Sequence, residues 1–127
     1  MNTKLKIALA VAVGAALGAG AMQGLHAQAK LKAYSVVELE PIGAGPQPAY
    51  LTAVRKAITD AHGRSLHTLG RVEHIEGAAA PKRVAIIEWD SLDDAMAFYK
   101  SKAWTDLAPE RDKTQKTIRR YVVEAEK

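Results

Sequence analysis

The sequence predicts an α+β domain in which two helices cover one face of a four-stranded antiparallel sheet. Residues 83–91 form a β-branched, apolar run that leads straight into residues 92–99, where apolar side chains recur at helical spacing. Strand-like residues 33–40 precede a helix-like segment, and alternating residues 118–124 close the chain. With a further strand before the central one, the order is β-α-β-β-α-β, the ferredoxin-like split βαβ arrangement.

The first strand, residues 33–40, alternates loosely between apolar and polar side chains. It ends at residues 41–48, where three prolines and two glycines in eight residues prevent a continuous hydrogen-bonded ladder. Pro48 suits the first turn of a helix, and apolar side chains then recur at helical spacing as far as Ala61. Gly63 is expected to end this helix as its C-terminal cap.

The second strand is expected to be long and bent. Residues 65–76 scatter apolar side chains among polar ones around Gly70, where we expect a bulge, and residues 77–81 form the turn into the central strand. After the central strand, Asp90 or Ser91 is expected to cap the next helix, because a short side-chain oxygen accepts hydrogen bonds from free backbone N–H groups.

The central strand has apolar side chains on both faces. Val84 and Ile86 point one way, whereas Ala85, Ile87 and Trp89 point the other way. Right-handed crossovers place this strand and the first strand side by side at the centre of the sheet. Because two helices cover only one face, we predict that a second copy covers the other and that the protein is a homodimer.

Residues 1–29 have the pattern of a secretory signal peptide. Two lysines precede an uncharged apolar run, Ile7 to Met22, and Ala27-Gln28-Ala29 supplies small residues for cleavage. We predict cleavage after Ala29, a mature domain of residues 30–127, and a periplasmic or secreted location without stable membrane association. The alternative is a retained membrane anchor, although this run of about 16 residues is shorter than the roughly 20 that a bilayer requires.

Charge and cysteine content argue against several classes of function. Removing the two lysines of the first 29 residues from the 18 Lys and Arg side chains leaves 16 against 14 acidic ones. This near balance gives little reason to expect a nucleic-acid partner, and the central strand lacks the aromatic and basic signature of RNA-binding sheets. Without cysteine, the chain has no disulfide framework, thiolate nucleophile or Cys-ligated metal.

The histidines do not have metal-site spacing. His67 and His74 lie seven residues apart on the predicted second strand, so regular alternation would send them to opposite faces. Neither an HxH nor an HExxH motif occurs, and we predict no metal and no cofactor.

Several motifs resemble those of the domain-of-unknown-function 1330 family. The resemblance is carried by the strand Val84–Ser91, the helix segment Ala95–Ser101, Trp104 and Pro109-Glu110-Arg111, and it extends over nearly the whole mature chain. It implies a dimeric α/β barrel, in which two ferredoxin-like sheets pack face to face, and it implies no established activity.

The chain departs from the pattern of this family at four places. His62 stands where the family usually has glycine, Ser65 where it has an aromatic or aliphatic residue, and Thr68 where it often has arginine. The missing arginine argues against a family anion site at the second strand. The segment Gly43-Ala44-Gly45 lengthens the loop before the first helix.

No motif of known catalytic chemistry occurs, so the prediction is an exported dimer that binds a small molecule between its two sheets. One alternative is a cofactor-independent small-molecule enzyme resembling the dimeric α/β barrel monooxygenases. The other is a non-catalytic structural or stress-related dimer. Trp89, Phe98, Tyr99 and Trp104 could form an aromatic pocket, although core packing is the more common role of such side chains.

Glu88 is the predicted centre of any site. An ionised carboxylate in the middle of a sheet is costly without a partner, so its face is expected to turn toward the second subunit. His67, Arg111 and Arg120 are its candidate partners, and together with Trp104 they complete the candidate ligand-binding residues. Glu88 could then act as an acid or base with a perturbed pKa. The alternative is that Glu88 pairs with an arginine and fixes the dimer register.

Overall fold

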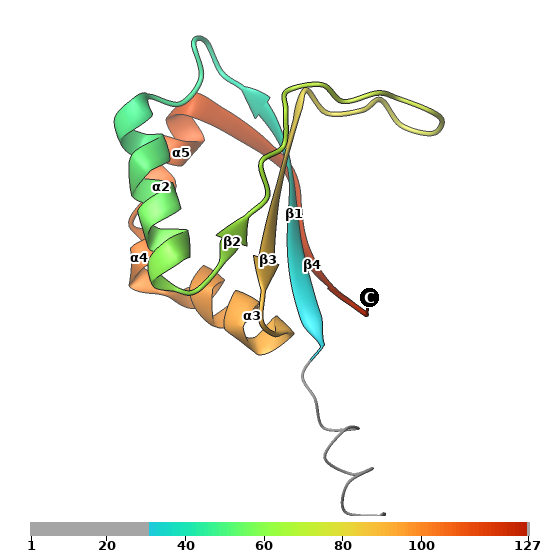
Figure 1. Ribbon diagram of the computed structural model, residues 1–127. Coiled ribbons are helices and arrows are strands. Elements are labelled where there is room, and N and C mark those ends of the chain that lie inside the picture. Colours follow the sequence, from blue (N-terminus) through green and yellow to red (C-terminus); the bar gives the residue numbers. More distant parts are fainter. Residues whose placement is uncertain (1–30, 127) are drawn as a thin grey trace, which may run out of the picture. The chain divides into compact units, whose positions relative to one another are not determined.

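The computed structural model describes residues 31–126, which form one sheet with its helices packed against one face (Figure 1). The elements are β1 (Lys32–Pro41), α2 (Pro48–Asp60), β2 (Arg64–Ser65), β3 (Arg83–Trp89), α3 (Leu92–Lys100), α4 (Lys102–Thr105), α5 (Ala108–Thr114) and β4 (Gln115–Ala125). The strand order is β2-β3-β1-β4, and all neighbouring strands are antiparallel. The predicted α+β fold, its ferredoxin-like strand order and its central pair of strands are confirmed.

Strand pairing determines which side chains share a face of the sheet. Val36 of β1 pairs with Ile86 of β3 and Tyr121 of β4, and these residues lie on the face without helices, which we call the open face. Val37 lies on the opposite face, called the helix face, and pairs there with Arg120. The two faces of the central strand therefore carry the side chains that the alternation predicts.

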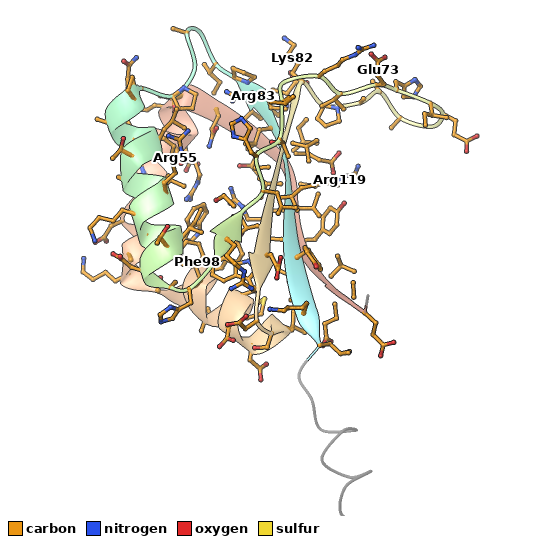
Figure 2. The ribbon with its side chains drawn as sticks, viewed as in Figure 1. Arg55, Glu73, Lys82, Arg83, Phe98 and Arg119 are labelled. Atoms are coloured by element: carbon orange, nitrogen blue, oxygen red, sulfur yellow. The ribbon has the colours of Figure 1, made fainter. Side chains whose placement is uncertain are left out.

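Trp89 lies at the centre of the core on the helix face. It is fully buried, its ring centroid lies 4.9 Å from that of Phe98 in α3, and its indole N–H donates a hydrogen bond of 2.6 Å to the Ser35 hydroxyl. Figure 2 shows Phe98 between the helices and the sheet, whereas Arg119 lies on the other side of the sheet. The aromatic contact thus joins α3 to β3, and the hydrogen bond joins β3 to β1.

The end of α2 corrects one expectation. The residue with left-handed backbone geometry is His62, at φ 62°, and not Gly63. This is the position at which the family that the chain resembles usually has glycine. Gly63 is needed for another reason, because a Cβ there would lie 2.8 Å from Ile58 Cγ2 and from the Trp89 ring. His62 thus takes the left-handed position of the cap, whereas Gly63 donates its N–H to Ile58 O and permits close packing of the turn against the core.

The second strand is much shorter than predicted. β2 has two residues, after which the Leu66 N–H donates to Ile86 O and the Thr68 hydroxyl donates to Val84 O, both at 2.8 Å. Regular pairing involves only Glu88 and Ile87, although β3 continues to Arg83. Residues 67–82 instead form an extended arm that projects beyond the sheet (Figure 1).

Serine residues mark the boundaries of the helices after β3. Of the two expected caps for α3, Ser91 is the one used, and its hydroxyl accepts a hydrogen bond of 3.1 Å from the Asp94 N–H. Ser101 ends α3, and its hydroxyl accepts from the Trp104 N–H at the start of α4 and donates to Phe98 O. These bonds satisfy backbone groups that the helix ends leave free.

The predicted signal peptide, residues 1–29, lies outside the described residues, so cleavage after Ala29 stays a prediction. Among the helices of residues 31–126, none is long and apolar enough to span a bilayer.

Candidate functional site

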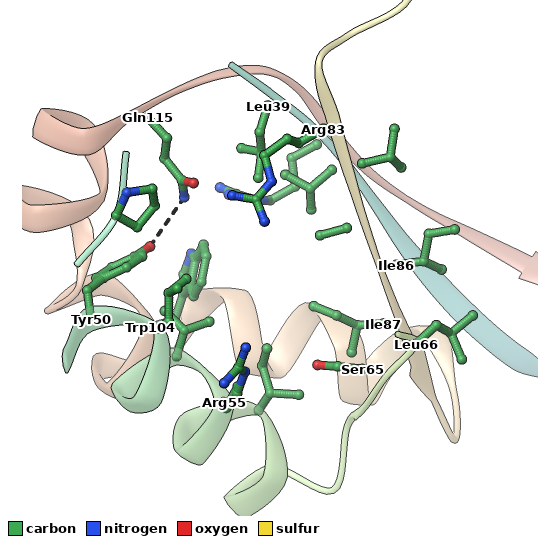
Figure 3. A pocket seen from close by; sticks show the side chains of 18 of the residues that line it. Leu39, Tyr50, Arg55, Ser65, Leu66, Arg83, Ile86, Ile87, Trp104 and Gln115 are labelled. Atoms are coloured by element: carbon green, nitrogen blue, oxygen red, sulfur yellow. Dashed lines mark hydrogen bonds between the residues drawn. The ribbon is translucent and has the colours of Figure 1, made fainter. Parts of the chain in front are cut away.

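A cavity of about 180 Å³ lies between α2 and the helix face of the sheet (Figure 3). Much of its wall is apolar and includes Val54 and Ile58 of α2 together with Val37, Ala85 and Ile87 of the central strands. The apolar side of α2 packs on the apolar helix face, as the sequence pattern predicts. The small side chain of Ala85 contributes to the space that remains between them.

Polar side chains reach the cavity from several elements. Arg55 of α2 and Arg83 of β3 extend toward it from opposite sides, and both are exposed to solvent (Figure 3). Deeper in the wall, the side-chain amide of Gln115 donates a hydrogen bond of 3.5 Å to the Tyr50 hydroxyl. Burial raises the pKa of Tyr50, so this phenol is protonated at neutral pH.

Trp104 lies against two arginines. The guanidinium carbon of Arg111 is 4.4 Å from the Trp104 ring centroid, and that of Arg120 is 4.6 Å from it. Arg120 also lies 5.8 Å from the Tyr99 ring centroid. Such cation–π contacts hold the indole in one orientation. Tyr99, Trp104 and Arg120 line the cavity and also a second hollow of about 350 Å³ beside Met96.

Three buried polar atoms near Trp104 have no hydrogen-bond partner within residues 31–126: Tyr99 Oη, Arg111 Nη1 and Arg120 Nε. Buried polar atoms are normally paired, so each such exception requires an explanation. Burial lowers the pKa of Arg120 and raises that of the Tyr99 hydroxyl, although Ser35 and Arg120 partly offset the effect on Tyr99. Tyr99 and Arg120 line both the cavity and the second hollow.

Glu88 lies away from this cavity, on the open face, where it pairs with Tyr34 across the strands. Its carboxylate accepts a hydrogen bond of 3.1 Å from Arg64 and lies 3.4 Å from the Lys32 ammonium. Asp90 joins the same cluster, at 3.0 Å from Arg64 and 2.9 Å from Lys32. The expected partners of Glu88 are thus corrected: His67, Arg111 and Arg120 do not contact it, because Arg64 of β2 and Lys32 of β1 are its strand neighbours.

The cluster favours the ionised form of its carboxylates. The Arg64 guanidinium and the Lys32 ammonium hold the pKa of Glu88 below its ordinary value, against the opposing effect of burial. Lys32 and then Arg64 hold the pKa of Asp90 low in the same way. Glu88 is therefore a charged, ion-paired side chain at neutral pH, which suits a structural role better than that of a general acid.

His67 lies at the start of the arm and is exposed. His74 lies farther along the arm, where its Nε2 is 3.0 Å from Gly77 O. Within the described part of the chain, no group of three or more His, Asp or Glu side chains is arranged to hold a metal ion.

Of the residues that line this cavity, the sequence predicts Trp104 and Arg120 as ligand-binding residues, for a ligand between two sheets, but not Tyr50, Arg55 or Arg83. The sequence does indicate the orientation of Arg120. It lies two residues before Val122 on the same strand, so both side chains point to the helix face. Arg55 falls outside the apolar spacing of its helix and Arg83 precedes the apolar run, so the pattern alone assigns both to solvent. Only the packing of α2 on the sheet brings them to one cavity.

Comparison with known proteins gives a family and a structural neighbour. Residues 32–125 match the profile of the family described as "Domain of unknown function (DUF1330)". No curated protein sequence matches the chain. A solved structure with a similar chain trace is SnoaB, a cofactor-independent oxygenase from Streptomyces nogalater, at 10% sequence identity and a TM-score of 0.49. The similarity covers 76% of this chain and 95% of SnoaB.

Proposed function

The chain belongs to the family described as a domain of unknown function (DUF1330), and on that premise we propose that it is an exported homodimer that binds a small molecule in the cavity between α2 and the sheet. The sequence alone suggested a ligand between two sheets. The proposal moves that ligand to the helix face, where a cavity is present within one subunit.

One observation carries the assignment of the cavity. Arg120 lines the cavity, and its Nε is a buried donor without a hydrogen-bond partner among the described residues. Leaving buried polar groups unpaired costs free energy, and a ligand that pairs them recovers it on binding. Arg120 is therefore the ligand-binding cation in this proposal, and Trp104 and Tyr99 line the cavity beside it. Arg111 is a positioning residue that packs on Trp104.

The test is titration calorimetry with benzoate and benzamide, which present the same ring with and without a charge. Ala85→Leu places a larger side chain in the cavity wall and is expected to weaken the binding of both probes. Ala97→Leu makes the same change on the exposed side of α3 and is expected to have no effect on binding. Urea unfolding verifies that both variants are folded. Failure of both probes to bind the unmodified protein, or full binding by a folded Ala85→Leu variant, contradicts the proposal.

The open face supports the homodimer. Its central residues are apolar or aromatic, namely Tyr34, Val36, Val84, Ile86, Tyr121 and Val123. Tyr121 and Val123 are 48% and 47% exposed in the single chain. A second copy packed face to face would remove this surface from water, since a two-fold contact brings each patch against its own copy. Export rests on the basic, apolar and small-residue order of residues 1–29.

A further inference from the structure

We propose that the ligand of this cavity is a small organic carboxylate with an apolar or aromatic body, and that Arg120, Arg55 and Arg83 neutralise its charge. This inference rests on the proposed binding function and adds the chemical class of the ligand. It follows from the way in which arginines and carboxylates are distributed over the described chain.

Seven arginines lie within residues 31–126, and they divide into two groups. Arg64, Arg71, Arg111 and Arg119 each have a carboxylate within 4.0 Å, supplied respectively by Glu88 and Asp90, Glu73, Asp112 and Glu38. The remaining three, Arg55, Arg83 and Arg120, have no carboxylate partner among the described residues. All three line the same cavity.

As far as residues 31–126 form it, the cavity wall contains three guanidinium groups and no Asp or Glu side chain. Arg120 is half-buried, whereas Arg55 and Arg83 are exposed. Of the three, it therefore gains the most free energy from a counter-ion, because a buried cation without one is costly. Its Nε donor is also unpaired. The first turn of α2, which has no acidic residue, contributes Tyr50 and Leu51 to the wall and adds the positive end of a 13-residue helix. An anion is the chemical group that this wall lacks.

A carboxylate fits these donors better than a larger, multiply charged anion. The planar guanidinium matches a carboxylate with two parallel hydrogen bonds. The Tyr99 hydroxyl, kept protonated because burial raises its pKa, is a further donor beside Arg120. The rest of the wall is apolar, so a phosphate without an organic body would leave most of it uncovered.

The size of the cavity limits the body of the ligand. An engineered apolar cavity of about 150 Å³ binds benzene, so the 180 Å³ here accommodates about one ring with its carboxylate. The Trp104 and Tyr99 rings offer aromatic surfaces for such a ring. Benzoate is therefore a suitable probe of the proposed class.

The experiment compares benzoate, benzamide, benzylamine and inorganic phosphate as ligands of the processed full chain by titration calorimetry. We expect benzoate to bind roughly tenfold or more tightly than benzamide, because charge-assisted hydrogen bonds are about twice as strong as neutral ones. Benzylamine is expected not to bind, since its ammonium would lie among guanidinium groups. Phosphate is expected to bind more weakly than benzoate.

Arginine variants test which side chains provide the selectivity. Arg120→Met keeps an apolar stem beside Trp104 and is expected to remove most of the preference for benzoate over benzamide. Arg83→Gln changes an exposed side chain, so folding is not at risk, and is expected to reduce the preference. Arg71→Met removes the same charge from an exposed arginine of the arm and serves as the control, with the preference unchanged.

The outcomes distinguish failure of the carboxylate inference from failure of the proposed binding function. Equal binding of benzoate and benzamide overturns the carboxylate inference but leaves the binding function standing. A preference that survives in both Arg120→Met and Arg83→Gln overturns the assignment of the arginines, and phosphate binding as tight as benzoate overturns the carboxylate class. Absence of binding by all four probes rejects the binding function itself.

Discussion

Gly63 lies where the turn after α2 passes directly against the Trp89 ring. A methyl group at this position would stand 2.8 Å from three carbon atoms of Ile58 and Trp89. The turn is held on both sides, by the hydrogen bond from Gly63 N–H to Ile58 O and by the pairing of β2 with β3. The backbone therefore has little freedom to move away.

Gly63→Ala is expected to lower the free energy of unfolding by about 1–3 kcal/mol, because overpacking forces neighbouring side chains out of their preferred rotamers. Gly70→Ala is the matched control, since a Cβ there meets no atom within 4 Å, and is expected to leave stability nearly unchanged. Urea unfolding of both variants measures the difference. Equal free energies of unfolding for the two variants would show that the close contact of Gly63 with Trp89 does not prevent a larger side chain at this position.

Glu88→Gln tests the ion cluster through its pH dependence. Because Arg64 and Lys32 depress the pKa of Glu88, the cluster stabilises the fold above the ordinary carboxyl pKa of about 4.3. This stabilisation is lost as the pH falls through the lower pKa of the folded state. Glu88→Gln should therefore reduce stability at neutral pH and flatten its decline in acid. Arg64→Gln, which removes the principal partner, should have the same effect.

The same variant also separates a structural role of Glu88 from a ligand-binding role. We expect Glu88→Gln to bind benzoate as the unmodified chain does, because Glu88 lies on the open face and not in the cavity. Loss of benzoate binding in an intact dimer would instead place Glu88 in the functional site. Acid titration of unfolding and calorimetry on one preparation measure both effects.

Among the elements, α3 begins where the strand–helix boundary predicts, with Ser91 as its cap. Ser91→Ala is expected to cost about 1 kcal/mol of stability, because the Asp94 N–H loses its acceptor. Asp90→Ala is the comparison, since Asp90 was the other expected cap. Asp90 makes exposed ion pairs instead, and these contribute little to stability. A larger loss in Asp90→Ala than in Ser91→Ala would contradict the assignment of the cap.

The elements also show how far the sequence determines the structure. Local patterns predict β1, α2, β3, α3 and the faces of the central strand, because alternation and helical spacing reflect burial directly. The length of β2 could not be predicted, because the Thr68 side chain, and not a backbone ladder, bonds β3 beyond Leu66. The partners of Glu88 depend on strand register. The cavity arises where α2 packs on the sheet, so the sequence pattern of either element alone does not predict it.

For the whole molecule, the proposed dimer predicts the response to charge on the open face. Val123→Glu places a carboxylate at the proposed interface and is expected to yield a folded monomer in light scattering, because a buried unpaired charge is costly. Met96→Glu introduces the same charge on α3 at a side chain that is also exposed, and should leave the dimer intact. A monomeric unmodified protein at micromolar concentration would refute the homodimer.

The predicted export and cleavage can be tested by measuring the intact mass of protein recovered from the periplasm. The expected chain begins at Lys30, after cleavage behind Ala29. A chain that still begins at Met1 and sediments with membranes would show that the first segment is retained as an anchor.

The short β2 has a consequence for the association of many copies. A sheet edge with free carbonyl groups is a template on which further strands can add, and this leads to aggregation. At the outer edge of β3, Leu66 N–H donates to Ile86 O and the Thr68 hydroxyl donates to Val84 O. These two carbonyl groups are therefore already hydrogen-bonded and do not offer a free edge to a strand from another molecule. The arm then leads the chain away from the edge. Growth of the sheet into a continuous ribbon is thereby hindered on this side, which leaves the open face as the surface for the proposed association of two copies.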